Sequence, residues 1–303
     1  MSNSHTFPIT SLQAEALRKK LKAQGYEFAA KPYTLFSAKT KGLAVSVYEK
    51  GPKVLLQGKK AKDFIEFTLE PEILGEVVYT NPELRDPAQF EPHIGVDESG
   101  KGDYFGPLVV AGAYTEKASA QALVKLGVTD SKLITDSKIP KLAKAIREMD
   151  AVSYSVILIS PKRYNELYSQ FKNLNKLLAW GHAKVVANIL EERPDCPRSL
   201  SDQFAKSEYV LSSAFKQQGL TLKLEQRTKA ESDVAVAAAS VLARDRFLSW
   251  MSKASEGAGM PIPFGGGAKV DKMGKAILKK HGKETLEQLV KLHFVNSKRI
   301  FSE

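Results

Sequence analysis

The sequence contains a single cysteine, Cys196, which excludes an internal disulfide and any metal site built from several cysteines. It also lacks a long hydrophobic run: the longest apolar stretch, 234–243, is too short to cross a bilayer. The opening residues, MSNSHTFPIT, contain no apolar segment of the kind found in signal peptides. We therefore expect a cytoplasmic protein with no membrane partner. No apolar heptad indicates a dimer, so we expect a monomer.

Acidic residues are in the minority. The chain has 45 Lys and Arg against 34 Asp and Glu, which gives a net charge of +11, and the pI is near 9.4. This balance favours a polyanionic partner, with nucleic acid as the first interpretation and a membrane surface as the second. The charge is uneven, because residues 1–62 carry twelve Lys and Arg and three Asp and Glu, whereas 63–98 carry one Arg and ten acids. The shift predicts a basic module, an acidic connector and a further domain.

The pattern of apolar residues predicts the organisation of these parts. In the basic module it predicts helices at 11–24 and 61–74 around a meander of strands at 26–38, 43–48 and 54–58. Residues 81–92 contain three prolines and are expected to form a linker. The predicted domains are therefore 1–80 and 93–303.

Strands and helices alternate in the second predicted domain. Strands are expected at 93–98, 106–115, 151–159, 198–202 and 221–226, and helices near 137–149, 161–170, 174–192, 231–253, 270–281 and 284–292. The stretch 257–269, rich in glycine and proline, is expected to be a mobile loop. Because the first strands form a meander and the later ones are separated by helices, we expect an α/β fold with a mixed sheet flanked by helices.

The segment GVDESGKGDYFGPLVVAGA, residues 95–113, places Asp97 and Glu98 just before a glycine-rich turn. Neighbouring side chains of a strand point to opposite faces. Gly100 and Gly102 predict that the strand ends here, so that both carboxylates reach one cleft. Two adjacent carboxylates repel each other, and a hard divalent cation such as Mg²⁺ or Mn²⁺ would remove the repulsion. A solvated surface turn is the alternative.

The same segment partly matches a phosphate-binding loop, with Gly95, four residues, Gly100 and Lys101. However, Gly102 occupies the position where Ser or Thr should bind the metal, and a strand rather than a helix is expected to follow. These departures disfavour a nucleotide triphosphatase.

Two further acids stand at predicted element ends: Asp202 after a short strand, and Glu231 near the start of a long helix. Asp233 is a rival of Glu231, and each of the two is also a natural helix-capping charge. Four carboxylates at the ends of one sheet can hold two metal ions, which then need no cysteine or serine nucleophile. The histidines show no ligand spacing, and His182 is expected to lie on a helix face rather than in a catalytic site.

Together the motifs GVDESGKGDYFGPLVVAGA, TDSKL (129–133), SDQF (201–204) and TKAESDVAVAAASVLARDRF (228–247) resemble those of the type 2 ribonucleases H, and most closely ribonuclease HIII. The resemblance covers almost all of 93–303. It implies a ribonuclease H-like mixed sheet, and an additional small α+β N-terminal domain resembling half of the TATA-box-binding protein.

The resemblance also implies site residues. It assigns metal binding and catalysis to Asp97, Glu98, Asp202 and Glu231, with Asp233 as the less favoured fourth acid. It assigns substrate contact to Gly100, Lys101 and Gly102, which would sense the ribose 2′-hydroxyl, and to Lys132 near the phosphates.

The implied activity is endonucleolytic hydrolysis of the RNA strand of RNA–DNA hybrids with Mg²⁺ or Mn²⁺, by a two-metal mechanism that leaves 3′-hydroxyl and 5′-phosphate ends. Two alternatives stay open: nicking at single ribonucleotides embedded in DNA, as in ribonuclease HII, and binding of nucleic acid without catalysis.

Overall fold

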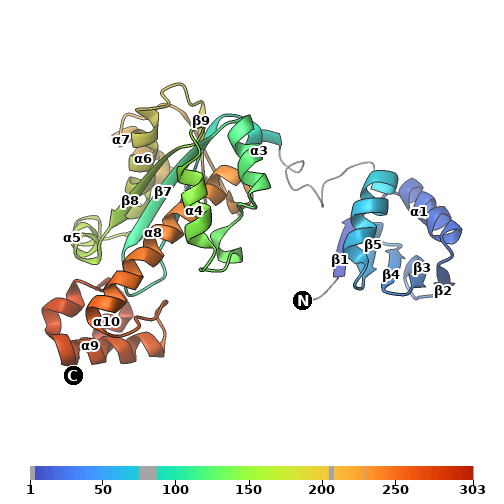
Figure 1. Cartoon of the computed structure of the whole chain (residues 1–303). Helices are drawn as coiled ribbons and strands as arrows, with labels where there is room; N and C mark the ends of the chain where they lie inside the picture. The colour runs from blue at the N-terminus through green and yellow to red at the C-terminus, as the bar shows by residue number, and fades with distance from the viewer. Residues whose placement is uncertain (1–3, 75–86, 205–207, 229, 303) are drawn as a thin grey trace. The chain divides into compact units, whose positions relative to one another are not determined.

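The computed structural model describes residues 4–74, 87–204, 208–228 and 230–302. The chain divides into two compact units, Met1–Pro87 and Ala88–Glu303, and each is described by itself (Figure 1). Of the predicted linker 81–92, residues 81–86 lie outside the described residues, and the rest includes a short 3₁₀ turn, Pro87–Phe90. Among the helices in the described ranges, none combines the length and the apolar character needed to cross a membrane.

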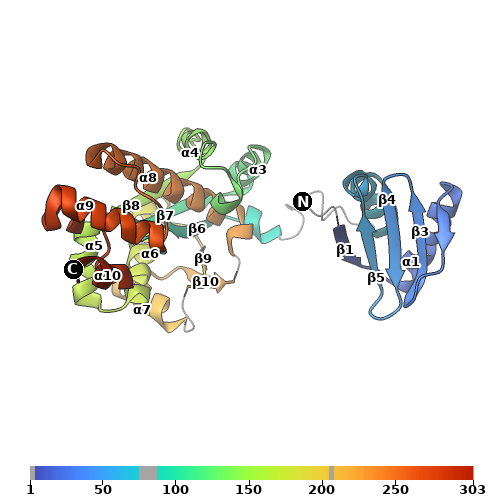
Figure 2. The same ribbon diagram turned by 90° about the horizontal axis from the view of Figure 1, so that it is seen from below.

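The first unit is a five-stranded antiparallel sheet in the order β1-β5-β4-β3-β2, with helices packed against it (Figure 2). Its core consists of apolar side chains from the strands and the helices, such as Leu17, Val45 and Leu56. The elements are β1 Ser4–Pro8, α1 Ser11–Ala23, β2 Glu27–Ala29, β3 Thr34–Thr40, β4 Leu43–Tyr48, β5 Lys53–Gln57, α2 Ala61–Phe64 and the π-helical η1 Ile65–Leu74.

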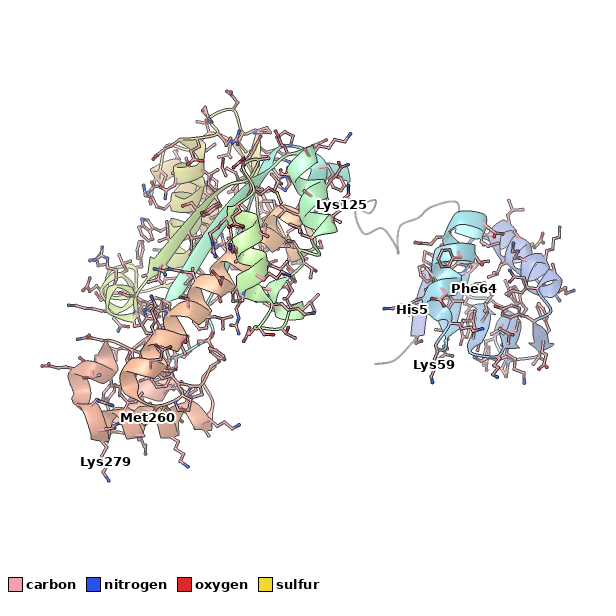
Figure 3. The ribbon with its side chains drawn as sticks, viewed as in Figure 1. His5, Lys59, Phe64, Lys125, Met260 and Lys279 are labelled. Carbon is pink, nitrogen blue, oxygen red and sulfur yellow. The ribbon has the colours of Figure 1, made fainter. Side chains whose placement is uncertain are left out.

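The predicted three-stranded meander is therefore incomplete. The strand expected at 26–38 is two strands, because the chain turns at Tyr33, whose φ of 63° lies in the left-handed region. Strand β1 was not expected, and it pairs along its whole length with β5. Phe64, labelled in Figure 3, packs into the core beside Tyr26 at the end of α2.

The second unit contains a five-stranded mixed sheet in the order β10-β9-β6-β7-β8. The meander β6–β7–β8 is antiparallel, and β9 and β10 are added in parallel. This is the α/β fold expected from the sequence. The strands are β6 His93–Ser99, β7 Leu108–Thr115, β8 Ser153–Ile159, β9 Arg198–Asp202 and β10 Lys223–Arg227.

Helices cover both faces of this sheet (Figure 1). One apolar cluster joins the sheet to α3, α4 and α8, and another joins it to α5, α6 and α7. The helices are α3 Lys117–Lys125, α4 Ile139–Arg147, α5 Pro161–Phe171, α6 Leu174–Leu190, α7 Tyr209–Gln217, α8 Val234–Ala258, α9 Ala268–Glu287 and α10 Val295–Phe301, with short 3₁₀ turns η3 Pro87–Phe90, η4 Ser131–Leu133 and η5 Ala230–Ser232.

Several helix boundaries differ from expectation. Helices α3, α7 and α10 were not predicted. The two helices expected at 270–281 and 284–292 are confirmed as two helical segments of α9, separated at Gly282, whose φ of 82° is not helical; the second segment ends at Glu287. The long helix begins at Val234 rather than at 231 or 232. Its first ten residues are buried, because they pack directly on β6 and β7.

We expect Gly95→Ala to destabilise the protein, because a Cβ at this position would overlap the backbone of Ala235 and Val236 in α8. Overpacking of this kind costs at least about 1–3 kcal/mol, and the obstacle here is backbone. Urea unfolding would measure the loss. Gly257→Ala is the control, since Gly257 lies in the same helix with no atom near its missing Cβ; equal midpoints for the two variants would contradict the prediction.

Candidate functional site

Asp97 and Glu98 lie inside strand β6, which continues to Ser99. The strand expected at 93–98 is therefore confirmed, and it ends just before Gly100, as the glycines indicate. Their side chains leave the sheet in opposite directions, as strand geometry requires. Asp97 lies near Ser240 of α8, and Glu98 meets His182 of α6, on the other face.

Both carboxylates nevertheless line one cleft of about 470 Å³ at the end of β6. The predicted residues Gly100, Lys101, Gly102, Lys132 and Asp202 line the same cleft. Seven of the eight predicted site residues are thus brought together. Glu231 is not among the lining residues, but its charge acts on Lys132.

Asp202 ends strand β9, the parallel neighbour of β6. Its Oδ1 accepts a hydrogen bond of 3.3 Å from the backbone N–H of Ala230. This bond brings the 3₁₀ turn that carries Glu231 to the end of β9. The carboxyl ends of two parallel strands thus collect the acids at one edge of the sheet, where α/β proteins commonly place their sites.

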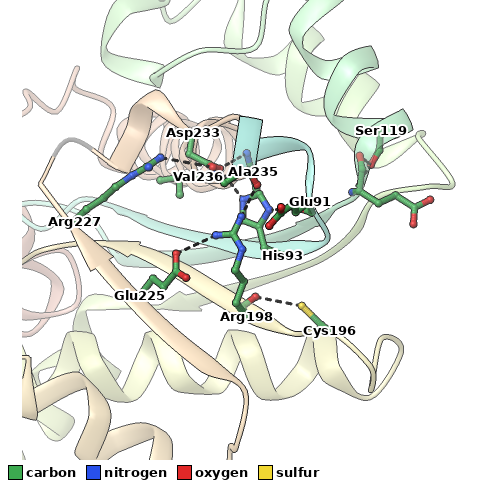
Figure 4. Close-up of polar contacts among 12 residues, drawn as sticks. Glu91, His93, Ser119, Cys196, Arg198, Glu225, Arg227, Asp233, Ala235 and Val236 are labelled. Atoms are coloured by element: carbon green, nitrogen blue, oxygen red, sulfur yellow. Dashed lines mark hydrogen bonds and ion pairs between the residues drawn. The ribbon is translucent and has the colours of Figure 1, made fainter. Parts of the chain in front are cut away.

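Asp233, the rival of Glu231, has a different role in the structure. It is the N-cap of α8, and its Oδ1 accepts the N–H groups of Ala235 and Val236 at 2.9 and 3.3 Å. The same oxygen lies 2.9 Å from Nε2 of the buried His93 (Figure 4). Asp233 is 2% exposed and is absent from the cleft lining. Glu231 therefore remains the candidate for the fourth acid.

The two acids of β6 differ electrostatically. Burial and the charge of Glu98 raise the pKa of Asp97 to about 8, although the backbone N–H of Glu98, Lys132 and Ser240 act in the opposite direction. Burial would also raise the pKa of Glu98, but its hydrogen bond to His182 and the charges of His182 and Lys101 outweigh this and hold it at about 2. One carboxylate is thus held charged while its neighbour favours a proton.

Two lysines supply positive charge to the cleft. Lys101 donates to Oε1 of Glu98 at 3.2 Å, and its ammonium lies 5.7 Å from the centre of the Phe204 ring. Burial alone would lower the pKa of Lys132, but the negative charges around it raise this pKa; they belong to Asp130, Asp97, Glu231 and Asp202. The side chain of Asp130 also accepts the N–H of Lys132, which fixes the local turn.

The acids of the cleft have the donor chemistry of a hard-metal site, because carboxylate oxygens are the preferred ligands of Mg²⁺ and Mn²⁺. Within the described ranges, however, no three His, Cys, Asp or Glu side chains are grouped closely enough to hold a metal ion as they stand. In the structure, the ammonium groups of Lys101 and Lys132 neutralise part of the negative charge of these carboxylates. The donor set fits a divalent cation, and the present side-chain arrangement would have to tighten to bind one.

The turn after β6 is rigidly built. Gly100 has a φ of 86°, and a Cβ there would overlap the carbonyl oxygen of Pro107, so only glycine fits. Gly102, by contrast, has open space around its missing Cβ. An atom of a bound molecule can therefore approach the backbone at Gly102.

Residues from the C-terminal part of the chain form hydrogen bonds with this turn. Lys291 is 0% exposed, and its ammonium donates to the carbonyl oxygens of Asp103 and Gly106 at 2.8 and 2.6 Å. The N–H of Gly265 donates to the Asp103 carboxylate at 2.6 Å, and Tyr104 donates its N–H to the Gly265 carbonyl. The part of 257–269 between the helices, expected to be a mobile loop, is thus hydrogen-bonded to the turn.

Sequence reasoning missed the partners that come from distant elements. His182 does lie on a helix face, as expected, but that face is buried and contacts Glu98. A signal was present, because His182 interrupts a run of mostly apolar residues, LLAWGHAKVV. Lys291 and Ser240 gave no comparable signal, since nothing near them in the sequence indicates what they face.

Two family models match the chain. The model described as ribonuclease HII matches residues 94–297, and a model described as a domain of unknown function matches residues 8–73. The two matches fall in the two compact units.

Curated relatives are similar over nearly the whole length. Ribonuclease HIII of Protochlamydia amoebophila is 43% identical over 93% of this chain and 91% of its own, and that of Chlamydia felis is 40% identical over 97% and 96%. Among solved structures, Bst-RNase HIII in complex with Mn²⁺ has a TM-score of 0.68 at 30% identity, covering 99% of this chain and 98% of its own. Aquifex aeolicus RNase H3 has a TM-score of 0.56 at 25% identity, with coverages of 95% and 99%.

Lys291 predicts a pH dependence of stability. Burial lowers its pKa to about 7 in the folded state, although the charge of Asp103 acts against this, and the ordinary value is 10.5. Between these pH values the unfolded chain binds the extra proton, so this group's contribution to stability rises with pH and is lost as pH falls through about 7. In this window we expect the free energy of unfolding of wild type to increase, relative to that of Lys291→Met, by up to about 1.4 kcal/mol per pH unit.

Urea midpoints at pH 7, 8 and 9 for wild type and Lys291→Met measure this difference. All other groups titrate in both proteins and cancel in the comparison. If the urea midpoints of the two proteins change in parallel with pH, burial does not destabilise the charged form of Lys291, and the prediction is wrong.

Proposed function

The chain belongs to the ribonuclease HII family, in its ribonuclease HIII branch, and from this premise we propose that it is an endonuclease that hydrolyses the RNA strand of RNA–DNA hybrids. The observation that carries the proposal is the convergence of Asp97, Glu98 and Asp202 on one cleft, beside a turn open at Gly102. An acidic site of this kind suits a phosphodiester only when cations neutralise it.

Asp97, Glu98, Asp202 and Glu231 would hold Mg²⁺ or Mn²⁺. When bound, a pair of such ions would supply activation of a water molecule and charge stabilisation of the leaving 3′-oxygen, consistent with 3′-hydroxyl and 5′-phosphate ends. The relative Bst-RNase HIII, solved with Mn²⁺, supports this choice of metal. The raised pKa of Asp97 means that its protonated carboxyl group would release a proton on binding a cation.

The chain's own side chains recognise the substrate in this proposal. Gly102 leaves the backbone accessible to a ribose, whose 2′-hydroxyl distinguishes RNA from DNA. Lys132 and Lys101 attract the phosphates, and Lys101 exchanges Glu98 for a phosphate oxygen as its partner. The basic first unit adds affinity for the duplex, and binding through phosphate contacts should weaken steeply with salt.

Other parts of the expectation stay predictions. A monomer would be tested by light scattering, and a cytoplasmic location by cell fractionation.

Replacing the first carboxylate tests the activity. We expect Asp97→Asn to reduce cleavage of an end-labelled RNA–DNA hybrid in Mg²⁺ by at least about 10²–10³-fold, because a charged group that stabilises the transition state is lost. Asp150→Asn is the control, since Asp150 is exposed and lies outside the cleft. Cutting should be confined to the RNA strand.

Three outcomes would contradict this proposal. Hybrid binding without cleavage by wild type, in Mg²⁺ and in Mn²⁺, would favour a binding protein. Cleavage only of a DNA duplex carrying one ribonucleotide would favour the specificity of ribonuclease HII. Equal cleavage by wild type and Asp97→Asn would mean that the site is misplaced.

The fourth acid is tested by a pair of variants. We expect Glu231→Gln to lose cleavage while the urea midpoint stays near that of wild type, because Glu231 is partly exposed and the cap of α8 is Asp233. Asp233→Asn should instead lose about 1–3 kcal/mol of stability, since the buried cap loses its charged contact with His93. If Asp233→Asn keeps its stability and loses cleavage, the assignment of the two acids is reversed.

A further inference from the structure

His182 is a buried side chain whose two ring-nitrogen contacts both lead to the proposed metal ligands. It is 0% exposed on α6, and its Nε2 donates to Oε2 of Glu98 at 3.1 Å. Its Nδ1 lies 2.9 Å from the hydroxyl of Ser201, the residue before Asp202. That hydroxyl in turn lies 3.1 Å from the carbonyl oxygen of Asp202. One imidazole therefore connects the ends of β6 and β9, on which three of the four proposed ligands stand.

Packing alone does not account for a histidine at this position. The surrounding residues of α6 belong to an apolar cluster that includes Leu178, Ala183 and Val186. A leucine would fill the same space without the cost of burying two ring nitrogens, which is offset only when both are hydrogen-bonded. Both ring nitrogens do have partners here. The Phe204 ring also packs edge-on against the imidazole, with ring centroids 4.9 Å apart.

The two side chains that contact the Glu98 carboxylate differ in their exposure to solvent. Oε1 is held by Lys101, a long side chain that is 37% exposed and borders the cleft. Oε2 is held by His182, which is fixed inside the sheet–helix interface. When Lys101 moves to a phosphate, the contact with His182 remains. The orientation of Glu98 then depends on the imidazole.

We propose that His182 is a positioning residue for divalent-cation binding: it fixes the Glu98 carboxylate and the end of β9 relative to each other before the cation arrives. This inference rests on the proposed function, because it takes Glu98 and Asp202 as metal ligands. Partners that orient metal ligands typically contribute 10–100-fold to metal affinity or activity.

The test is a titration of the full-length protein with Mn²⁺ alone, with free Mn²⁺ followed by electron paramagnetic resonance. His182→Leu keeps the volume and removes both hydrogen bonds, and we expect its Mn²⁺ affinity to fall about 10–100-fold. His182→Gln can still present an N–H to Glu98, and it should recover part of the loss. Val186→Ala, one turn further along the same buried face, controls for lost packing and should bind Mn²⁺ like wild type.

Cleavage kinetics supply a second readout. With His182→Leu, the kcat for the hybrid in limiting Mg²⁺ should fall while KM changes little, and added Mg²⁺ should restore kcat. A merely structural role would lower the affinity of His182→Leu and Val186→Ala alike, in step with their urea midpoints.

The outcomes separate the two proposals. If wild type cleaves the hybrid but His182→Leu binds Mn²⁺ as tightly as wild type, the positioning role is overturned and the proposed function stands. If His182→Leu does not fold, the comparison rests on His182→Gln, and an affinity equal to that of Val186→Ala overturns the role. If wild type neither binds Mn²⁺ nor cleaves, both proposals are overturned.

Discussion

Mutual repulsion among buried carboxylates is the constraint on which the second unit depends. Asp97 and Glu98 are adjacent in one strand and largely withdrawn from water, so neither can be fully charged without a nearby cation. The two carboxylates have separate polar partners, on opposite faces of the sheet. Glu98 is kept charged by His182 and Lys101, whereas Asp97 has its pKa raised toward 8. Both acids thus depend on cationic partners, and in the proposed function a divalent cation would supply further positive charge.

The same constraint explains the close packing around β6. A carboxylate can be desolvated only if the neighbouring elements approach the strand, and Gly95 lets the first turn of α8 rest directly on it. The start of α8 is in turn fixed by Asp233, which caps the helix and contacts His93 at the other end of the strand. The position of Glu231, two residues before the cap, follows from it. Gly95, Asp233 and His93 therefore help to set the positions of the acids, although none of the three lines the cleft.

A feature of the fold or of the site could be predicted from the sequence when the interactions that fix it are local, and not when they join residues far apart in the chain. The strand carrying Asp97 and Glu98, and the strand ending at Asp202, were predicted because alternating and apolar patterns are local. The start of α8 was misplaced, because the choice between Glu231 and Asp233 as cap depends on His93, 140 residues away. His182 was placed on the correct helix, but its partner is 84 residues away. Strand β1 was missed because its partner β5 follows it along the chain only after a helix and three other strands.

The arrangement of the lysines suggests how one site can serve both free and bound states. In the structure Lys101 is paired with Glu98, and the charges of four acids act on Lys132. A divalent cation would take over this neutralisation and release both ammoniums. They would then be beside the cleft and without their carboxylate partners at the moment when a phosphate needs them. In the proposed reaction, the cation would therefore take over the neutralisation of the acids, and the two ammoniums would become available to the phosphates.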